Sequence, residues 1–142
     1  MDLILGTHRF EPTDLLIMAI VNRTPDSFYD KGASYADDSA MRRVEEAVAA
    51  GAHIIDIGGV KAGPGQTVDA KEEIRRTASF VGAVRSRFSD VIISVDTWRA
   101  EVGRAACAEG ANVINDAWGA WEPELAEVAA EFHAGLVCTH TG

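Results

Sequence analysis

Polar residues stand at the carboxyl ends of the short apolar runs in this sequence. They are Asn22, Asp56, Asp96, Asn115 with Asp116, and His140. Carboxylates accept hydrogen bonds from ring N–H groups and carboxamides both donate and accept, so this set suits recognition of a heterocycle edge. Asp96 alone could cap a following helix, and Asp116 alone could be a turn residue. Capping does not readily explain polar residues after every run, which favours a binding site.

The apolar runs predict strands, and the intervals between them predict helices. The strands are expected at Leu15–Val21, His53–Ile57, Val91–Val95, Asn112–Ile114 and Leu136–Thr139. Such short apolar runs are typical of strands buried on both faces. Helical periodicity covers Asp38–Ala50, Ala70–Phe88, Trp98–Glu109 and Pro123–Phe132. This alternation predicts a parallel α/β sheet, in which the carboxyl ends of the strands lie at one edge. A hairpin of Leu3–Leu5 and His8–Phe10 is expected before it.

Glycines and a weak internal repeat support this interpretation. Gly51 and Gly110 follow helix candidates, and Asp69 stands three residues before Glu72, as in a helix capping box. The segment Gly51–Asp56 resembles Gly110–Asn115. Repetition of a βα unit favours a (β/α) barrel. The long connections Asn22–Asp37 and Gly58–Asp69 are predicted to be functional loops.

Composition excludes several classes of function. The 142 residues are 47% apolar, and 13 basic against 22 acidic side chains leave no basic surface for nucleic acid. No apolar run approaches the roughly 20 residues of a membrane-spanning helix, and the first residues do not resemble a secretory signal. Cys107 and Cys138 lack metal-ligand spacing and are interpreted as reduced, partly buried thiols. We therefore expect a soluble cytoplasmic protein.

Several segments carry a specific resemblance to dihydropteroate synthases. The segment Ile20–Phe28, with the sequence IVNRTPDSF, resembles the first signature of that family. Further similar segments are Asp56–Gly59 with Pro64-Gly65, Ser94–Thr97, and Asn115-Asp116. The resemblance extends from about Leu16 to His140. Corrinoid-linked methyltransferases share a pterin-binding barrel but lack the TPDSF segment.

The resemblance implies a TIM (β/α)8 barrel of the pterin-binding type and a role in folate biosynthesis. The family joins p-aminobenzoate to 6-hydroxymethyl-7,8-dihydropterin pyrophosphate, which gives 7,8-dihydropteroate and pyrophosphate. By resemblance, Asp96, Asn115 and Asp56 would bind the pterin, and Asn22 would ligate the Mg²⁺ that carries the pyrophosphate. His140 matches a family histidine at the fifth strand end, where a core imidazole is an equal alternative. A homodimer is also expected.

The second family loop is altered in this sequence. Where the family has Glu-Ser-Thr-Arg, the chain has Val60-Lys61-Ala62-Gly63, and glycine cannot replace the planar guanidinium of arginine. We predict a divergent homologue with weak or absent synthase activity. The alternatives are a non-catalytic pterin-binding partner protein or a fragment without function.

Two further groups of residues have open interpretations. Arg23, Thr24, Lys61 and His140 are candidate loop and phosphate contacts, and Lys31 could join Arg23 and Lys61 in a basic cluster. Scattered surface charges are the alternative. Trp98, Trp118 and Trp121 could stack on the pterin or cover the barrel edge.

Length decides what part of a barrel is expected. A complete (β/α)8 barrel takes roughly 250 residues. Residues 1–142 should therefore form a single pterin-binding domain that is incomplete at its carboxyl end, with about the first five strands and four helices. Such a half would expose strand edges and apolar faces, and we would not expect catalysis from it alone.

Overall fold

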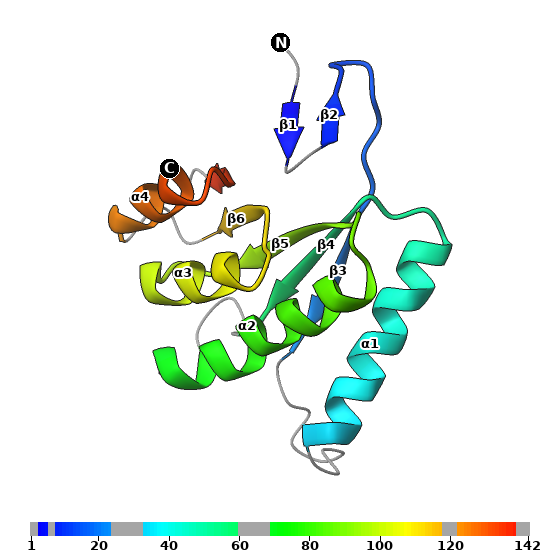
Figure 1. The fold of residues 1–142 in the computed structure, drawn as a ribbon, viewed down its shortest axis with the longest axis horizontal. Coiled ribbons are helices and arrows are strands. Elements are labelled where there is room, and N and C mark those ends of the chain that lie inside the picture. The colour runs from blue at the N-terminus through cyan, green and yellow to red at the C-terminus, as the bar shows by residue number, and fades with distance from the viewer. Residues whose placement is uncertain (1–2, 6–7, 24–32, 60–68, 118–121, 139–142) are drawn as a thin grey trace.

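The computed structural model describes residues 3–5, 8–23, 33–59, 69–117 and 122–138, with only the backbone described for 33–36. Two layers are present, a parallel sheet and four helices packed on one of its faces, and a small hairpin lies at one end (Figure 1). The elements are β1 (Leu3–Leu5), β2 (His8–Phe10), β3 (Met18–Asn22), α1 (Ala33–Ala49), β4 (Ile54–Gly58), α2 (Ala70–Arg87), β5 (Ile92–Asp96), α3 (Ala100–Ala108), β6 (Val113–Asp116), α4 (Glu124–Glu131) and β7 (Gly135–Cys138).

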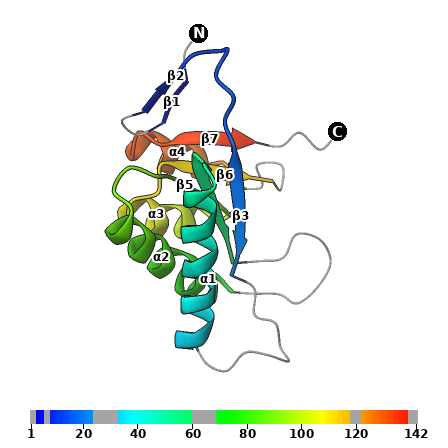
Figure 2. The same cartoon turned by 90° about the vertical axis from the view of Figure 1, so that its right-hand side faces the viewer.

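The sheet has the strand order β3-β4-β5-β6-β7, with every neighbouring pair parallel. Figure 2 shows the helices on one side of β3 and the β1–β2 hairpin beyond the amino ends of the strands. The hairpin is antiparallel, with Leu3 opposite Phe10. The predicted parallel α/β architecture and the hairpin are therefore confirmed.

Three elements begin two or more residues away from the start that the sequence predicts. Strand β3 begins at Met18 rather than Leu15, because the N–H of Ile17 donates to Nδ1 of His53 at 3.1 Å instead of to a strand carbonyl. Helix α1 begins at Ala33 rather than Asp38. The connection predicted for Asn22–Asp37 is therefore five residues shorter at its carboxyl end. No glycine or proline interrupts residues 33–37, and the helix extends through them. Helix α3 begins at Ala100, for a reason given below.

The core lies between the sheet and the helices. Alternate strand residues supply one side of it, and apolar helix stripes supply the other. Val44 of α1 is fully buried, and Met41, Ala47 and Val48, which share one face of the helix with it, pack against the same cluster. The strand side is formed mainly by isoleucine and valine: Val21, Ile55, Ile57, Ile93, Val95 and Ile114.

The internal repeat has a structural counterpart. Gly51 and Gly110 have φ values of 98° and 119°, which favour glycine, and each precedes a strand. His53 and Asn112 occupy equivalent places, since each side chain accepts a hydrogen bond from the backbone of the preceding strand segment. Nδ1 of His53 accepts from Ile17, and Oδ1 of Asn112 accepts from Ile93 at 3.0 Å. The repeated sequence therefore builds a repeated strand junction.

The sheet face opposite the helices is partly exposed. Met18 and Ile20 of β3 are 47% and 65% exposed, and Val137 of β7, which is in register with Asn115, is 52% exposed. Within the described ranges, β3 and β7 each pair on one side only. This arrangement matches the expected first five strands of a barrel.

Two expectations from composition can be compared with the structure. Among the described helices, none has the length and apolar character needed to cross a membrane. Cys107 and Cys138 are free. Burial raises the pKa of the Cys107 thiol to about 11. Cys138 is exposed, so the prediction of partial burial is wrong for it, because it ends the edge strand β7.

His133, two residues after the end of α4, gives a test of backbone strain. His133 has a φ of 54°, a left-handed conformation in which a Cβ costs free energy. Replacing it by glycine (His133→Gly) should raise the free energy of unfolding by about 1 kcal/mol. Thermal denaturation measures the change. His133→Ala retains the Cβ and is the matched control, and an equal gain in both variants would contradict this explanation.

Candidate functional site

Strand register brings four of the polar and glycine positions into one row at the carboxyl edge of the sheet. Asn22 pairs with Gly58, Gly58 with Asp96, and Asp96 with Asn115. Residues in register on parallel strands project to the same face, so Asn22, Asp96 and Asn115 share the face opposite the helices. Asp56 stands in the next row toward the amino ends, between Ile20 and Ser94. We call these two rows the polar rows.

Asp56 links the two polar rows through hydrogen bonds. Its carboxylate is 2% exposed and accepts from the Ser94 hydroxyl at 2.7 Å. The same oxygen accepts a longer bond of 3.5 Å from the Asn115 amide. Burial raises the pKa of Asp56, while the bonds from Ser94 and Asn115 oppose that rise. Asp56 therefore orients the amide of Asn115 at the site.

The Asp96 carboxylate accepts fewer hydrogen bonds than its two oxygens could. Its Oδ1 atom is buried and has no hydrogen-bond partner among the described residues. Burial raises the pKa of Asp96 to about 7, and the charges of Asp56, Glu73 and Asp116 add to the rise. A buried carboxylate oxygen without a partner is costly, and a ligand that donates a hydrogen bond would remove that cost.

Gly58 keeps space open beside this carboxylate. A Cβ atom built at Gly58 would lie 3.3 Å from the Cβ of Asp96. That contact is tighter than ordinary van der Waals packing. The absence of a side chain at this position therefore leaves room between Asn22 and Asp96 in the outer polar row.

Glu73 lies behind the site and was not identified from the sequence. It belongs to α2, is fully buried, and accepts from the Thr97 hydroxyl at 2.6 Å. Its other oxygen accepts from the Arg99 guanidinium at 3.0 Å. A signal was available in the sequence, because Glu73 falls on the same helical stripe as the apolar Val81 and Val84, where a charge is unusual.

The turn after β5 explains the start of α3. The N–H of Arg99 donates to the Thr97 hydroxyl at 3.2 Å, so residues 97–99 form a turn rather than a first helical turn. The predicted start at Trp98 is wrong for this reason. Arg99 is the N-cap and makes no side-chain cap bond, whereas Glu122 accepts from the N–H of Ala100 at 2.9 Å. Asp96 is therefore not the cap of this helix.

The remaining predicted residues are placed as follows. Asn22 is exposed at the end of β3. The Arg23 guanidinium lies 4.7 Å from the centre of the Phe80 ring and pairs with Asp37, between α1 and α2. Asp116 is buried at the end of β6. The residues that fall outside the described ranges are Thr24, Lys31, Val60–Gly63 with Lys61, Trp118, Trp121 and His140.

Trp98 borders the site on the turn after β5. It is half-buried, and the Arg99 guanidinium lies 4.5 Å from the centre of its ring. This stacking uses one face of the indole. The two interpretations of Trp98, a stacking partner for a pterin or a cover for the barrel edge, both remain predictions.

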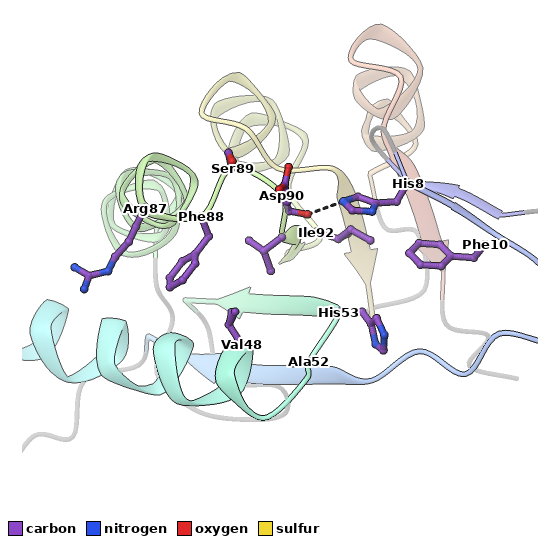
Figure 3. Close-up of a pocket in the computed structure, with 11 residues that line it drawn as sticks. His8, Phe10, Val48, Ala52, His53, Arg87, Phe88, Ser89, Asp90 and Ile92 are labelled. Atoms are coloured by element: carbon purple, nitrogen blue, oxygen red, sulfur yellow. Dashed lines mark hydrogen bonds between the residues drawn. The ribbon is translucent and has the colours of Figure 1, made fainter.

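A separate cavity of about 460 Å³ lies at the amino ends of the strands. Figure 3 shows His8 and Phe10 of the hairpin facing His53 and Ile92, with Phe88 farther along the cavity. His8 is fixed there by a 2.6 Å hydrogen bond between Nε2 and the carbonyl of Asp90. Because His53 precedes β4 and Ile92 begins β5, this cavity is distant along the strands from the polar rows.

Comparison with known proteins identifies the family. The sequence profile of the pterin binding enzymes matches residues 18–142. The chain belongs to this family. A relative named inactive dihydropteroate synthase 2, from Mycobacterium leprae, is 61% identical over 127 residues, which cover 89% of this chain and 44% of that protein. A protein named dihydropteroate synthase from Synechocystis is 45% identical over 87% of this chain and 43% of its own length.

Solved structures agree with the pterin-binding fold. A dihydropteroate synthase from Xanthomonas albilineans, solved with 4-aminobenzoic acid, superposes with a TM-score of 0.86 at 33% identity. The match covers 99% of this chain and 51% of that one. This pterin-binding family member thus spans about half the length of the relatives it matches or less. The predicted resemblance to dihydropteroate synthases and the predicted barrel type are both confirmed.

Proposed function

We propose that this chain provides the pterin-binding strand ends of a dihydropteroate-synthase-like protein of folate biosynthesis whose synthase activity is weak or lost. The observation that carries the proposal is the buried, unpartnered Oδ1 of Asp96 in one row with Asn115. A pterin presents ring N–H groups and ring acceptors along one edge. Carboxylate and carboxamide side chains complement such an edge.

Asp96, Asn115 and Asp56 would divide the recognition of the pterin between them. Asp96 would accept from ring N–H groups, and Asn115 would supply both a donor and an acceptor. Asp56 supports this arrangement from below, because its hydrogen bonds to Ser94 and Asn115 restrict their rotation. A site with few water molecules strengthens each of these charged hydrogen bonds.

Asn22 is the residue that would hold Mg²⁺. Its amide oxygen is a hard donor of the kind Mg²⁺ accepts, and the side chain is exposed at the end of β3. Within the described ranges no three His, Cys, Asp or Glu side chains gather into a metal centre. Mg²⁺ would therefore take most of its ligands from water and from substrate phosphates, which it would help to neutralise. Arg23, Thr24, Lys61 and His140 stay predicted loop and phosphate contacts.

The altered loop at residues 60–63 and the name of the relative from Mycobacterium leprae support weak or absent synthase activity. Two substrates, dihydropterin pyrophosphate and p-aminobenzoate, are expected for an active relative. A non-catalytic pterin-binding partner protein is the second candidate, favoured because the 61% identical relative is named inactive. Cytoplasmic location and a homodimer are further predictions.

Calorimetric titration tests the binding proposal. The protein at its natural length is titrated with 6-hydroxymethyl-7,8-dihydropterin pyrophosphate, with and without Mg²⁺. We expect saturable binding that Mg²⁺ strengthens, since Asn22 would help to hold the metal and its positive charge would favour the pyrophosphate. A folded protein that shows no binding under either condition would overturn the proposal.

A loop replacement tests why synthase activity would be low. Changing Val60-Lys61-Ala62-Gly63 to Glu-Ser-Thr-Arg should raise the rate of dihydropteroate formation by at least about tenfold, because an arginine fork would again be available for substrate. Replacement by Ala-Ala-Ala-Ala is the control. A folded variant without any gain would locate the defect elsewhere in the protein.

A further inference from the structure

Glu73 is a fully buried carboxylate on α2, behind the polar rows rather than within them. We propose that Glu73 is a positioning residue for the ligand site, because it holds the turn of residues 97–99 and thereby fixes the Asp96 carboxylate. The inference rests on the proposed pterin-binding function. Glu73 would support the ligand site without touching the ligand itself.

Both carboxylate oxygens of Glu73 are engaged by the same turn. Oε2 accepts from the Thr97 hydroxyl at 2.6 Å, and Oε1 accepts from the Arg99 guanidinium at 3.0 Å. The Thr97 hydroxyl also accepts from the N–H of Arg99 at 3.2 Å. The two contacts of Glu73 fix the turn relative to α2, and the third stabilises the turn itself. Two oxygens held by different partners leave the carboxylate one orientation.

The turn that Glu73 holds begins directly after Asp96. Thr97 is fully buried, and its N–H donates to the carbonyl of Asn115 at 3.2 Å. A displacement of Thr97 would therefore move the end of β5 relative to β6. Those two strand ends carry Asp96 and Asn115, the pair proposed to recognise the pterin. Glu73 thus controls the spacing between the two groups.

Stability alone is a poor explanation for a charge in this place. Removing a carboxylate from water costs free energy that a buried ion pair often fails to recover, and apolar replacements of buried pairs are frequently neutral. Farther along the same stripe of α2, Val81 and Val84 are fully buried apolar residues. Its charge also lies close enough to add to the raised pKa of Asp96. A role in the geometry of Asp96 accounts for both facts.

The test compares pterin affinity in Glu73→Gln and Glu72→Gln. Glutamine keeps the size of Glu73 but cannot accept from both partners with a full charge. We expect the affinity for 6-hydroxymethyl-7,8-dihydropterin pyrophosphate to fall about tenfold. A displaced Asp96 carboxylate would lose about one charge-assisted hydrogen bond to the pterin, which corresponds to that factor. Glu72 pairs with Arg75 and Arg76 toward the surface, so Glu72→Gln should leave affinity within about twofold.

A double-mutant cycle separates positioning from a general loss of structure. If Glu73 acts through Asp96, the effect of Glu73→Gln should fall below about twofold in an Asp96→Asn background. Thr97→Ser should retain pterin affinity and Thr97→Val should lose it, because only serine keeps the hydroxyl that donates to Glu73. These two variants test the inference even if Glu73→Gln does not fold. Equal losses in both backgrounds, or full affinity in Glu73→Gln, would overturn the inference. A wild-type protein that binds no pterin would overturn the proposed function and this inference together.

Discussion

Replacing Asp96 by asparagine is expected to weaken pterin binding about 100-fold and, above neutral pH, to stabilise the fold. The carboxylate would accept two hydrogen bonds from ring N–H groups, whereas an amide offers one acceptor and an NH₂ group that opposes the ligand's donor. Losing charge-assisted bonds of roughly 1.5–3 kcal/mol each accounts for that factor. Calorimetry with dihydropterin pyrophosphate measures it, and Asp38→Asn on the exposed side of α1 is the control.

The stability effect of Asp96→Asn has the opposite sign because the folded protein resists ionisation of this group. The pKa of Asp96 is raised to about 7 in the folded protein, above its unfolded value of about 3.9. Ionisation therefore costs stability progressively as pH rises from about 4 to 7, and the cost is constant above that range. Since part of the side chain faces solvent, the variant should gain about 1–2 kcal/mol at pH 8 and nothing at pH 4.

Two outcomes would contradict this explanation of Asp96. Denaturant unfolding at both pH values gives the stability difference. Equal stabilisation at pH 4 and pH 8 would mean that charge is not the cause. Unchanged pterin affinity would mean that the unpartnered oxygen does not face the ligand.

Replacing Arg85 by alanine is expected to lower the free energy of unfolding by about 3 kcal/mol or more. Its guanidinium donates to the carbonyl of Gly110 at 3.0 Å, to Oδ1 of Asn112 at 2.6 Å and to the carbonyl of Val91 at 2.7 Å. Carbonyls of Phe88 and Ser89 accept from it as well. The change would leave several half-buried acceptors without a donor at the junction of α2, β5 and β6.

Arg87 provides a matched control two residues farther along the chain. Its side chain is 58% exposed and pairs with Glu45 at 3.0 Å. An exposed ion pair contributes roughly 0–1 kcal/mol, so Arg87→Ala should change stability by less than about 1 kcal/mol. Denaturant titration compares the two variants. Similar losses in both would show that the carbonyl contacts of Arg85 contribute little.

Local pattern predicted the secondary structure well and its boundaries less well. The alternation of strands and helices was predicted because apolar periodicity and helix-ending glycines such as Gly51 act over a few residues. The early start of α1 and the late start of α3 were missed. The start of α3 depends on Glu73, which contacts the turn before that helix, and on Glu122, which accepts from the N–H of Ala100 at its first residue.

The alternation of strands and helices, the polar residues at the strand ends and the resemblance to dihydropteroate synthases can all be read from the sequence. The hydrogen bonds of Asp56 to Ser94 and Asn115, and the contact of Glu73 with the turn beside Asp96, become visible only in the folded chain. The difference follows from distance along the chain. Apolar period and turn chemistry are local, whereas strand register and the packing of α2 against that turn join residues 24 to 59 positions apart.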